Sequence, residues 1–283
     1  MEEKTLRIKL IATDLDGTLL DGFGKLTPKS LSVMQACEER GIHFVMASGR
    51  LFEGIRLLAR KANLHSPIIS SNGGRVDLTP YGPSIMEDTL PPDLARPVFD
   101  ILKASGLYIE CYSGNAIYRS HPKLSPFLRS PDDYVPVECI PDEDGFAQRF
   151  VDDVDRMEAE GMNQAYKFAA FSRNPEELNA IIRKLQGLPV TINSSFPFNI
   201  EIMEAGHGKG RAIRFLQEYY QLEKEEIMTF GDSTNDLEMM LASGVPVAMG
   251  NALEEVKKAA SIIAPPNTED GEAQIIEQYV LGS

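Results

Sequence analysis

The chain has 283 residues, and its composition, 43% hydrophobic and 25% charged, is ordinary for a globular protein. This length allows one large domain or two smaller ones. The formal net charge of −14 argues against nucleic acid or an anionic membrane as the main partner, because both attract basic surfaces. We expect no membrane span and no secretory signal, since no apolar run is long enough and the first residues lack a basic and an apolar region.

The cysteines give a further indication of the compartment. Cys37, Cys111 and Cys139 are far apart and odd in number, which fits neither a disulfide framework nor a zinc knuckle. We therefore expect three small buried thiols in a reducing, cytoplasmic environment. Nothing in these patterns specifies an oligomeric state.

In the first part of the chain strands alternate with helices. An apolar run at Ile8–Ala12 predicts a short buried strand. Thr27 is a suitable N-cap for a helix that has Pro28 at its first position and stops at Gly41. The next expected elements are a strand at Ile42–Ala47, a helix through Ile55, Leu58 and Ala62, and a strand at Pro67–Ser70. This alternation predicts a parallel sheet with helices on its faces.

From about Pro83 the pattern changes to hairpins mixed with helices, which predicts an α+β unit with an antiparallel sheet. One helix is expected at Asp93–Ala104, and a second runs from its cap, Asn174, to about Leu185. The acidic segment 142–161 shows little periodicity and predicts no element. The expected strands are Tyr108–Tyr112, Ala116–Arg119, Val135–Ile140, Ala165–Phe171, Val190–Asn193 and Phe198–Met203.

From Gly206 the first pattern returns. The expected elements are a helix that opens at Gly208-Lys209-Gly210 and runs through Tyr220, a strand at Ile227–Phe230, a helix at Leu237–Ser243, and strands at Val245–Ala248 and Ile262–Ile263. We therefore expect an α/β fold in which a Rossmann-like parallel-sheet core is formed by residues 1–83 and 198–283. The α+β unit, residues 84–197, is expected as an inserted cap domain.

Two carboxylates stand two residues apart where the first strand ends, in Asp14-Leu15-Asp16-Gly17-Thr18. Acids this close raise each other's pKa unless a cation or hydrogen-bond donors hold them. Mg²⁺ prefers carboxylate and carbonyl oxygens, and Gly17 permits a sharp turn beside a ligand. The motif alone also fits a solvated turn, because Asp and Gly are common in turns.

Other polar residues follow the remaining strands of the expected core. Ligands of open parallel sheets bind beyond the carboxyl ends of the strands. If the sheet is parallel, these residues therefore meet on one rim, and we expect them to form a single site. They are Asp14, Asp16, Ser48, Asp232, Asn235 and Asp236.

Four motifs occur in a recognisable order: Asp14-Leu15-Asp16-Gly17-Thr18, Ser48-Gly49-Arg50, Lys209 before Gly210, and Gly231-Asp232-Ser233-Thr234-Asn235-Asp236. On these motifs the chain resembles the haloacid dehalogenase superfamily of phosphatases, specifically its Cof-type branch with an inserted α/β cap. The segments 71–74 and 247–252 resemble further parts of that branch. The resemblance covers nearly all of the expected core but little of the cap.

The resemblance implies a Mg²⁺-dependent phosphatase that acts on small phosphorylated metabolites, with sugar phosphates as the expected class. It implies that Asp14 is the nucleophile, which forms an aspartyl phosphate, and that Asp16 is the general acid and base. Thr18 would hold Asp16. The groups implied to bind the phosphoryl oxygens are Ser48, Lys209, Asn235 and the N–H groups of Leu15 and Gly49. Asp14, Asp232 and the Asp16 carbonyl would bind the metal, and Asp236 would orient Lys209 or a metal-bound water.

Simpler explanations exist for single residues and for the whole chain. Ser48 alone fits a helix cap, and Lys209 alone fits a surface lysine. The polar cap residues that could select the leaving group, but equally fit a solvated surface, are His121, Lys123, Arg129 and Lys167. The other histidines, His43, His65 and His207, are expected in surface or packing positions. Two other functions are a sugar phosphomutase of the same superfamily and a non-catalytic module that binds a phosphorylated metabolite.

Overall fold

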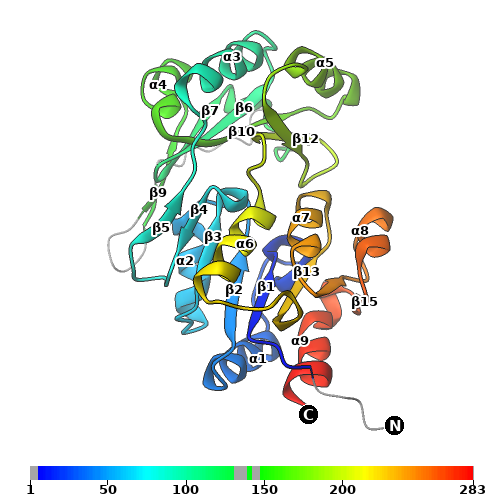
Figure 1. Ribbon diagram of the computed structural model, residues 1–283. Coiled ribbons are helices and arrows are strands. Elements are labelled where there is room, and N and C mark those ends of the chain that lie inside the picture. Colours follow the sequence, from blue (N-terminus) through cyan, green and yellow to red (C-terminus); the bar gives the residue numbers. More distant parts are fainter. Residues whose placement is uncertain (1–5, 131–138, 142–146, 283) are drawn as a thin grey trace. The chain divides into compact units, whose positions relative to one another are not determined.

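The computed structural model describes residues 6–130, 139–141 and 147–282, which divide into two compact units (Figure 1). The core unit consists of Met1–Glu87 and Gly208–Ser283, and the cap unit is Asp88–His207. The cap unit is thus a single insertion between the two pieces of the core unit.

Both ends of this insertion differ from the boundaries expected at residues 84 and 197. Strand β5 (Ser84–Glu87) pairs with β4 (Arg75–Asp77) and so belongs to the core sheet. Strand β12 (Asn199–Glu204) pairs with β10 and β11 of the other sheet and so belongs to the cap. The boundary drawn before residue 198 is wrong because the apolar pattern of a strand does not indicate which neighbour it pairs with.

The core unit contains an eight-stranded sheet, in the order β15-β14-β13-β1-β2-β3-β4-β5. Neighbours from β15 to β3 run parallel, whereas β4 and β5 form an antiparallel edge that the sequence pattern did not predict. The bounds of the parallel strands are Leu10–Thr13 (β1), His43–Ala47 (β2), Ile68–Ser70 (β3), Ile227–Gly231 (β13), Val245–Ala248 (β14) and Ile262–Ile263 (β15). The predicted parallel sheet is therefore confirmed.

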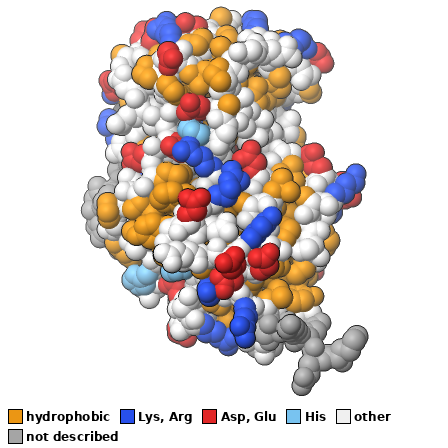
Figure 2. Space-filling model, viewed as in Figure 1, with side chains coloured by type: hydrophobic (Ala, Val, Ile, Leu, Met, Phe, Trp, Pro, Cys, Tyr) orange, Lys and Arg blue, Asp and Glu red, His pale blue; other side chains and the backbone are white. Residues whose placement is uncertain are grey.

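Helices cover both faces of this sheet, so its central strands β1 and β13 are buried on both sides. Ile11 of β1 packs with the side chains of one helical layer, and its neighbours Leu10 and Ala12 pack with the other. The first layer is α1 (Pro28–Glu39), α2 (Phe52–Lys61), α8 (Glu254–Ala259) and α9 (Gly271–Ile276), and the second is α6 (Lys209–Tyr219) and α7 (Leu237–Leu241). On the face in Figure 2, acidic and basic side chains are interspersed.

The predicted ends of α1 are confirmed. The Thr27 hydroxyl accepts the Ser30 N–H at 3.0 Å, which caps the helix. At the other end Gly41 has φ +74°, and the Ile42 N–H donates to the Cys37 carbonyl at 2.9 Å. This is the left-handed glycine stop that the sequence indicated. Cys37 itself is buried and free, as is Cys111.

The cap unit contains a seven-stranded sheet, in the order β11-β12-β10-β6-β7-β9-β8, which is antiparallel except between β7 and β9. Helices α3 (Pro92–Lys103), α4 (Val154–Ala159) and α5 (Pro175–Leu185) contribute to the main apolar cluster with this sheet. Its other strands are β6 (Tyr108–Ser113), β7 (Ala116–Ser120), β8 (Cys139–Pro141), β9 (Ala147–Val151), β10 (Ala165–Phe171) and β11 (Val190–Asn193).

Two segments of the cap differ from the sequence-based picture. The strand expected at Val135–Ile140 lies mostly outside the described residues, and β8 begins at Cys139. The acidic segment 142–161, which predicted no element, contains all of β9 and all of α4. Within the described parts of the chain, no helix combines the length and the apolar character that a membrane span requires.

Candidate active site

The first motif forms a wide turn at the end of β1. The Leu19 N–H donates to the Asp14 carbonyl at 3.2 Å, and the Leu20 N–H donates to the Leu15 carbonyl at 2.9 Å. Gly17 has φ +91°, and a Cβ placed on it would lie 2.4 Å from Oδ2 of Asp232. Only glycine fits both the backbone angle and the space, so the turn brings the early acids against the late acidic loop.

Lys209 links this turn to the second piece of the core unit. It is the first residue of α6, and its Nζ lies 2.5 Å from Asp14 Oδ1 and 2.7 Å from Asp236 Oδ1. The lysine is only 1% exposed, so a surface position is excluded. The start of α6 packs on the short turn that follows β3, where a Cβ on Gly73 would lie 2.3 Å from the Gly208 carbonyl oxygen.

The loop after β13 holds the remaining acids. Asp236 Oδ2 accepts the N–H groups of Asp232 and Ser233 at 3.0 and 3.1 Å. With Oδ1 bound to Lys209, both of its oxygens therefore have partners, and its contact with Lys209 fits the orienting role that the sequence indicated. Asn235 is almost completely buried, and its Nδ2 donates to Asn72 Oδ1 at 3.3 Å.

Burial dominates the electrostatics of this cluster. Burial raises the pKa of Asp14 well above its usual value; Lys209 opposes the rise, and Asp236 and Asp232 add to it. Burial and then Asp236 raise the pKa of Asp232 to about 7. Burial by itself lowers the pKa of Lys209, but the Asp14 and Asp236 carboxylates outweigh it and raise the pKa. The lysine therefore remains a cation.

The same cluster fits a divalent metal. One carboxylate oxygen from each of Asp14, Asp232 and Asp236 lies within 4.8 Å of the others. Three ionised carboxylates beside one lysine leave two negative charges in a buried place, which is unfavourable unless a cation enters. Oxygen donors of this kind suit Mg²⁺. Because both Asp236 oxygens are already bound, the residues best able to hold the metal are Asp14 and Asp232.

Asp16 lies at the exposed edge of the cluster. Its side chain is 46% exposed and accepts two hydrogen bonds from Arg50, one from Nε at 2.9 Å and one from Nη2 at 2.6 Å. The bond expected from Thr18 to Asp16 is not found. The Thr18 hydroxyl instead donates to Asp232 Oδ1 at 3.3 Å, because the turn at Gly17 directs residue 18 toward the late acidic loop.

Ser48 and Gly49 follow β2 on the same rim. Ser48 is 2% exposed, and its Oγ accepts the Arg50 N–H at 3.3 Å. A helix-capping role for Ser48 is excluded, because α2 begins at Phe52 and its N-cap is Leu51. The Leu15 side chain is buried in the core, so only its backbone can meet a ligand.

Several residues that hold the site were not assigned roles from the sequence. Arg50 binds Asp16, Asn72 binds Asn235, and Asn251 donates from Nδ2 to the Gly17 carbonyl at 2.8 Å. All three stand in segments that the family resemblance had marked, so a signal existed. The Glu272 carboxyl lies 2.8 Å from the Thr13 hydroxyl at the end of β1, and no motif indicated it.

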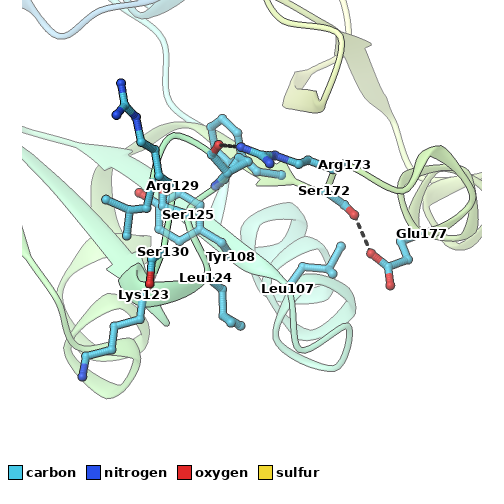
Figure 3. A pocket seen from close by; sticks show the side chains of 13 residues that line it. Leu107, Tyr108, Lys123, Leu124, Ser125, Arg129, Ser130, Ser172, Arg173 and Glu177 are labelled. Atoms are coloured by element: carbon cyan, nitrogen blue, oxygen red, sulfur yellow. Dashed lines mark hydrogen bonds between the residues drawn. The ribbon is translucent and has the colours of Figure 1, made fainter. Parts of the chain in front are cut away.

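The cap contains a cavity of about 370 Å³, formed by residues of that unit alone and lined by two of the four predicted cap candidates, Lys123 and Arg129 (Figure 3). Both of these side chains extend away from the cavity in that view. Lys167 is instead buried against Glu201 and the Tyr112 ring. The fourth candidate, His121, is exposed at the start of a short turn.

Known proteins that are similar to this chain include named phosphatases. A family model described as haloacid dehalogenase-like hydrolase matches residues 11–276. A 5-amino-6-(5-phospho-D-ribitylamino)uracil phosphatase of Bacillus subtilis (strain 168) is 28% identical and covers 97% of this chain and 99% of its own. A pyridoxal phosphate phosphatase of Escherichia coli (strain K12) is 27% identical, and the match covers 96% of this chain and 99% of the relative. The solved structure of a haloacid dehalogenase-like hydrolase from B. subtilis is 26% identical and has a TM-score of 0.81. That match covers 96% of this chain and 100% of the solved one.

Proposed function

Because the chain belongs to the haloacid dehalogenase-like hydrolase family, we propose that it is a Mg²⁺-dependent phosphatase acting on small phosphorylated metabolites in the cytoplasm. One observation carries the proposal: the buried Asp14 carboxylate contacts Lys209 beside Asp232 and Asp236. A carboxylate nucleophile next to fixed positive charge and a metal-binding cluster is what attack on a charged phosphate ester requires.

The residues around Asp14 are suited to hold the phosphoryl group. Lys209 is cationic and buried, so its charge acts through a medium of low dielectric. The Ser48 hydroxyl and the Gly49 N–H would donate to the phosphoryl oxygens. Mg²⁺, held by Asp14, Asp232 and the Asp16 carbonyl, would supply positive charge that offsets the repulsion between the ester and the attacking carboxylate.

The two steps of the proposed reaction use Asp14 and Asp16. In the first, an Asp14 oxygen attacks phosphorus, the ester P–O bond breaks, and Asp16 gives its proton to the departing alkoxide. In the second, Asp16 takes a proton from a water molecule as that water attacks phosphorus. The bond between the Asp14 oxygen and phosphorus breaks, and inorganic phosphate is released. Asp14 is again a carboxylate and Asp16 again carries its proton.

For the substrate we propose a phosphate monoester of a small metabolite, with sugar phosphates as the class to test first. The names of two relatives point to a phosphorylated ribitylaminouracil and to pyridoxal phosphate, so these esters belong in the same panel. Release of inorganic phosphate distinguishes a phosphatase from a phosphomutase, which would return an isomerised sugar phosphate. A non-catalytic binding module would release no phosphate above the rate without enzyme.

We predict that Asp14→Asn abolishes phosphate release from every ester in the panel and leaves the circular dichroism spectrum unchanged, because an amide is a far weaker nucleophile. EDTA should abolish the activity of the wild-type protein, and added Mg²⁺ should restore it. Asp93→Asn, an exposed change in the first turn of α3, is the matched control and should keep full activity. Turnover of p-nitrophenyl phosphate by Asp14→Asn at the wild-type rate would remove Asp14 as the nucleophile.

A further inference from the structure

The contact between Arg50 and Asp16 has no part in the scheme above. Two guanidinium nitrogens, Nε and Nη2, each donate to a different oxygen of the carboxylate, at 2.9 and 2.6 Å. Such a two-point contact fixes the plane of a carboxylate as well as its position, which a single ammonium group does not do. The side chain of Asp16 is thereby held in one orientation.

The backbone that carries Arg50 is itself held. The Arg50 N–H donates to Ser48 Oγ at 3.3 Å, and the Arg50 carbonyl accepts the Ser71 N–H at 2.8 Å. The Ser48 carbonyl accepts the Asn72 N–H at 2.9 Å. Ser71 and Asn72 both have positive φ, 51° and 56°, a strained pair of conformations that these contacts keep in place. The backbone from which the Arg50 side chain reaches Asp16 is therefore fixed.

The backbone of Asp16 is anchored as well, by the turn at Gly17 and by the Asn251 side chain, which donates to the Gly17 carbonyl. What is left free is rotation of the Asp16 side chain, and Arg50 restricts that rotation. A carboxylate has about four lone-pair directions, so the two contacts leave others available for a leaving group or a water molecule.

The ion pair contributes little to folding stability. The side chains of Arg50 and Asp16 are 37% and 46% exposed, and water screens the attraction between charges at such exposure. A change of Arg50 is therefore expected to leave the fold intact, so its effect on turnover can be measured without interference from unfolding.

We propose that Arg50 is a positioning residue for proton transfer: its guanidinium fork holds the Asp16 carboxyl in the orientation from which it protonates the leaving group. This inference rests on the proposed function. It predicts a selective defect, because an ester with a poor leaving group needs the proton and an ester with a good one does not. p-Nitrophenyl phosphate releases a stable phenolate, whereas an alkyl phosphate releases a strongly basic alkoxide.

The test compares Arg50→Gln with the wild type on both kinds of ester. For the alkyl phosphate that the wild type cleaves fastest, kcat should fall roughly 30–100-fold, since proton transfer contributes about 10²–10⁴-fold and depends on placement. For p-nitrophenyl phosphate the loss should stay below about 5-fold, and KM should change little for either ester. Arg50→Lys should recover only part of the lost rate, because an ammonium cannot make the two-point contact.

Two further variants separate this role from others. In the Asp16→Asn background, Arg50→Gln should have no further effect beyond about 2-fold, because residues that act together are not additive. The control is Arg156→Gln, since Arg156 makes the same two-point contact with Glu160 on a cap helix at similar exposure and should leave the ratio of the two rates unchanged.

The outcomes distinguish the inference from the proposed function. Equal losses on both esters, a rise in KM for both, or an additive effect in the Asp16→Asn background would overturn the role of Arg50 while leaving the phosphatase in place. A wild-type protein that cleaves no ester would overturn both.

Discussion

A buried carboxyl group behind Asp14 is the clearest single-residue feature outside the candidate active site. Glu272 is 3% exposed, and its Oε1 has no hydrogen-bond partner among the described residues. The Thr13 hydroxyl lies 2.8 Å from both Glu272 Oε2 and the Asp14 carbonyl, yet it has one proton to donate. Both contacts are satisfied only if Glu272 is protonated and donates to Thr13. Burial raises the pKa of Glu272 to about 8, with Thr13 opposing and Asp14 adding to the rise.

We predict from this residue that Glu272→Gln becomes more stable relative to the wild type as the pH rises from about 5 to 8. Between the ordinary pKa of 4.5 and the folded value of about 8, the unfolded chain has lost the proton that the folded chain keeps. The free energy of unfolding of the wild type therefore falls with pH, by at most about 1.4 kcal/mol per unit, and glutamine removes this dependence.

Urea unfolding at several pH values in EDTA measures the difference. Glu255→Gln, an exposed change on α8, should show no such trend. A stability difference between Glu272→Gln and the wild type that does not vary with pH would mean that Glu272 is already ionised in the folded protein.

At the scale of elements, the turn after β1 is the feature that assembles the site. It carries Asp14 and Asp16, its Gly17 leaves the space that the Asp232 carboxylate occupies, and the Gly17 carbonyl accepts a hydrogen bond from Asn251. The sequence motif indicated that Gly17 permits a turn beside a ligand, and its φ of +91° is the left-handed conformation on which this wide turn depends. The short 3₁₀ turn at Thr234–Asp236 plays the corresponding part for the other acids.

We predict that Gly17→Ala abolishes phosphatase activity, because its Cβ would meet the Asp232 carboxylate at 2.4 Å in addition to straining the backbone. Gly24→Ala is the matched control: φ there is +72°, but no atom lies within 4 Å of the added Cβ. Both variants should lose about 1–3 kcal/mol of stability from backbone strain, measured by thermal unfolding, whereas only Gly17→Ala should lose activity and Mg²⁺ affinity. Equal activity in the two variants would show that the contact with Asp232 has no functional role.

At the scale of the whole molecule, the proposed metal would join two segments that are far apart in the sequence. Asp14 comes from the first piece of the core unit and Asp232 from the second, with the whole cap unit between them. The acids repel one another until a cation enters, so occupation of the site is coupled to the stability of the core.

We predict that Mg²⁺ at about 100 times its dissociation constant stabilises the protein by about 2.7 kcal/mol. The midpoint of thermal unfolding should rise by about 5–10 °C as a result. Asp232→Asn should remove this response. Burial raises the pKa of Asp232 to about 7, so ionising this carboxyl costs more in the folded protein than in the unfolded chain. At pH 8 without metal this cost lowers the stability of the wild type, and in EDTA the Asn variant should therefore be at least as stable. Glu255→Gln should keep the full response to Mg²⁺, and an undiminished shift in Asp232→Asn would place the metal elsewhere.

Most helices and strands, and the central acidic residues of the site, could be predicted from short stretches of sequence. Apolar runs, caps such as Thr27 and stops such as Gly41 depend on a few neighbouring residues, so they can be recognised in the sequence alone. The motifs also indicated that Asp14, Asp232 and Lys209 belong to one site, and the structure brings them into contact or close to one another.

Partners far apart in the chain were decided only by the tertiary structure. Whether β12 joins the core or the cap depends on which strand it pairs with, and the partner of Thr18 depends on the turn at Gly17. The hold of Arg50 on Asp16 likewise joins two loops that only the sheet brings together. Local chemistry determined which residues can react, whereas the packing of distant segments determined which of them meet.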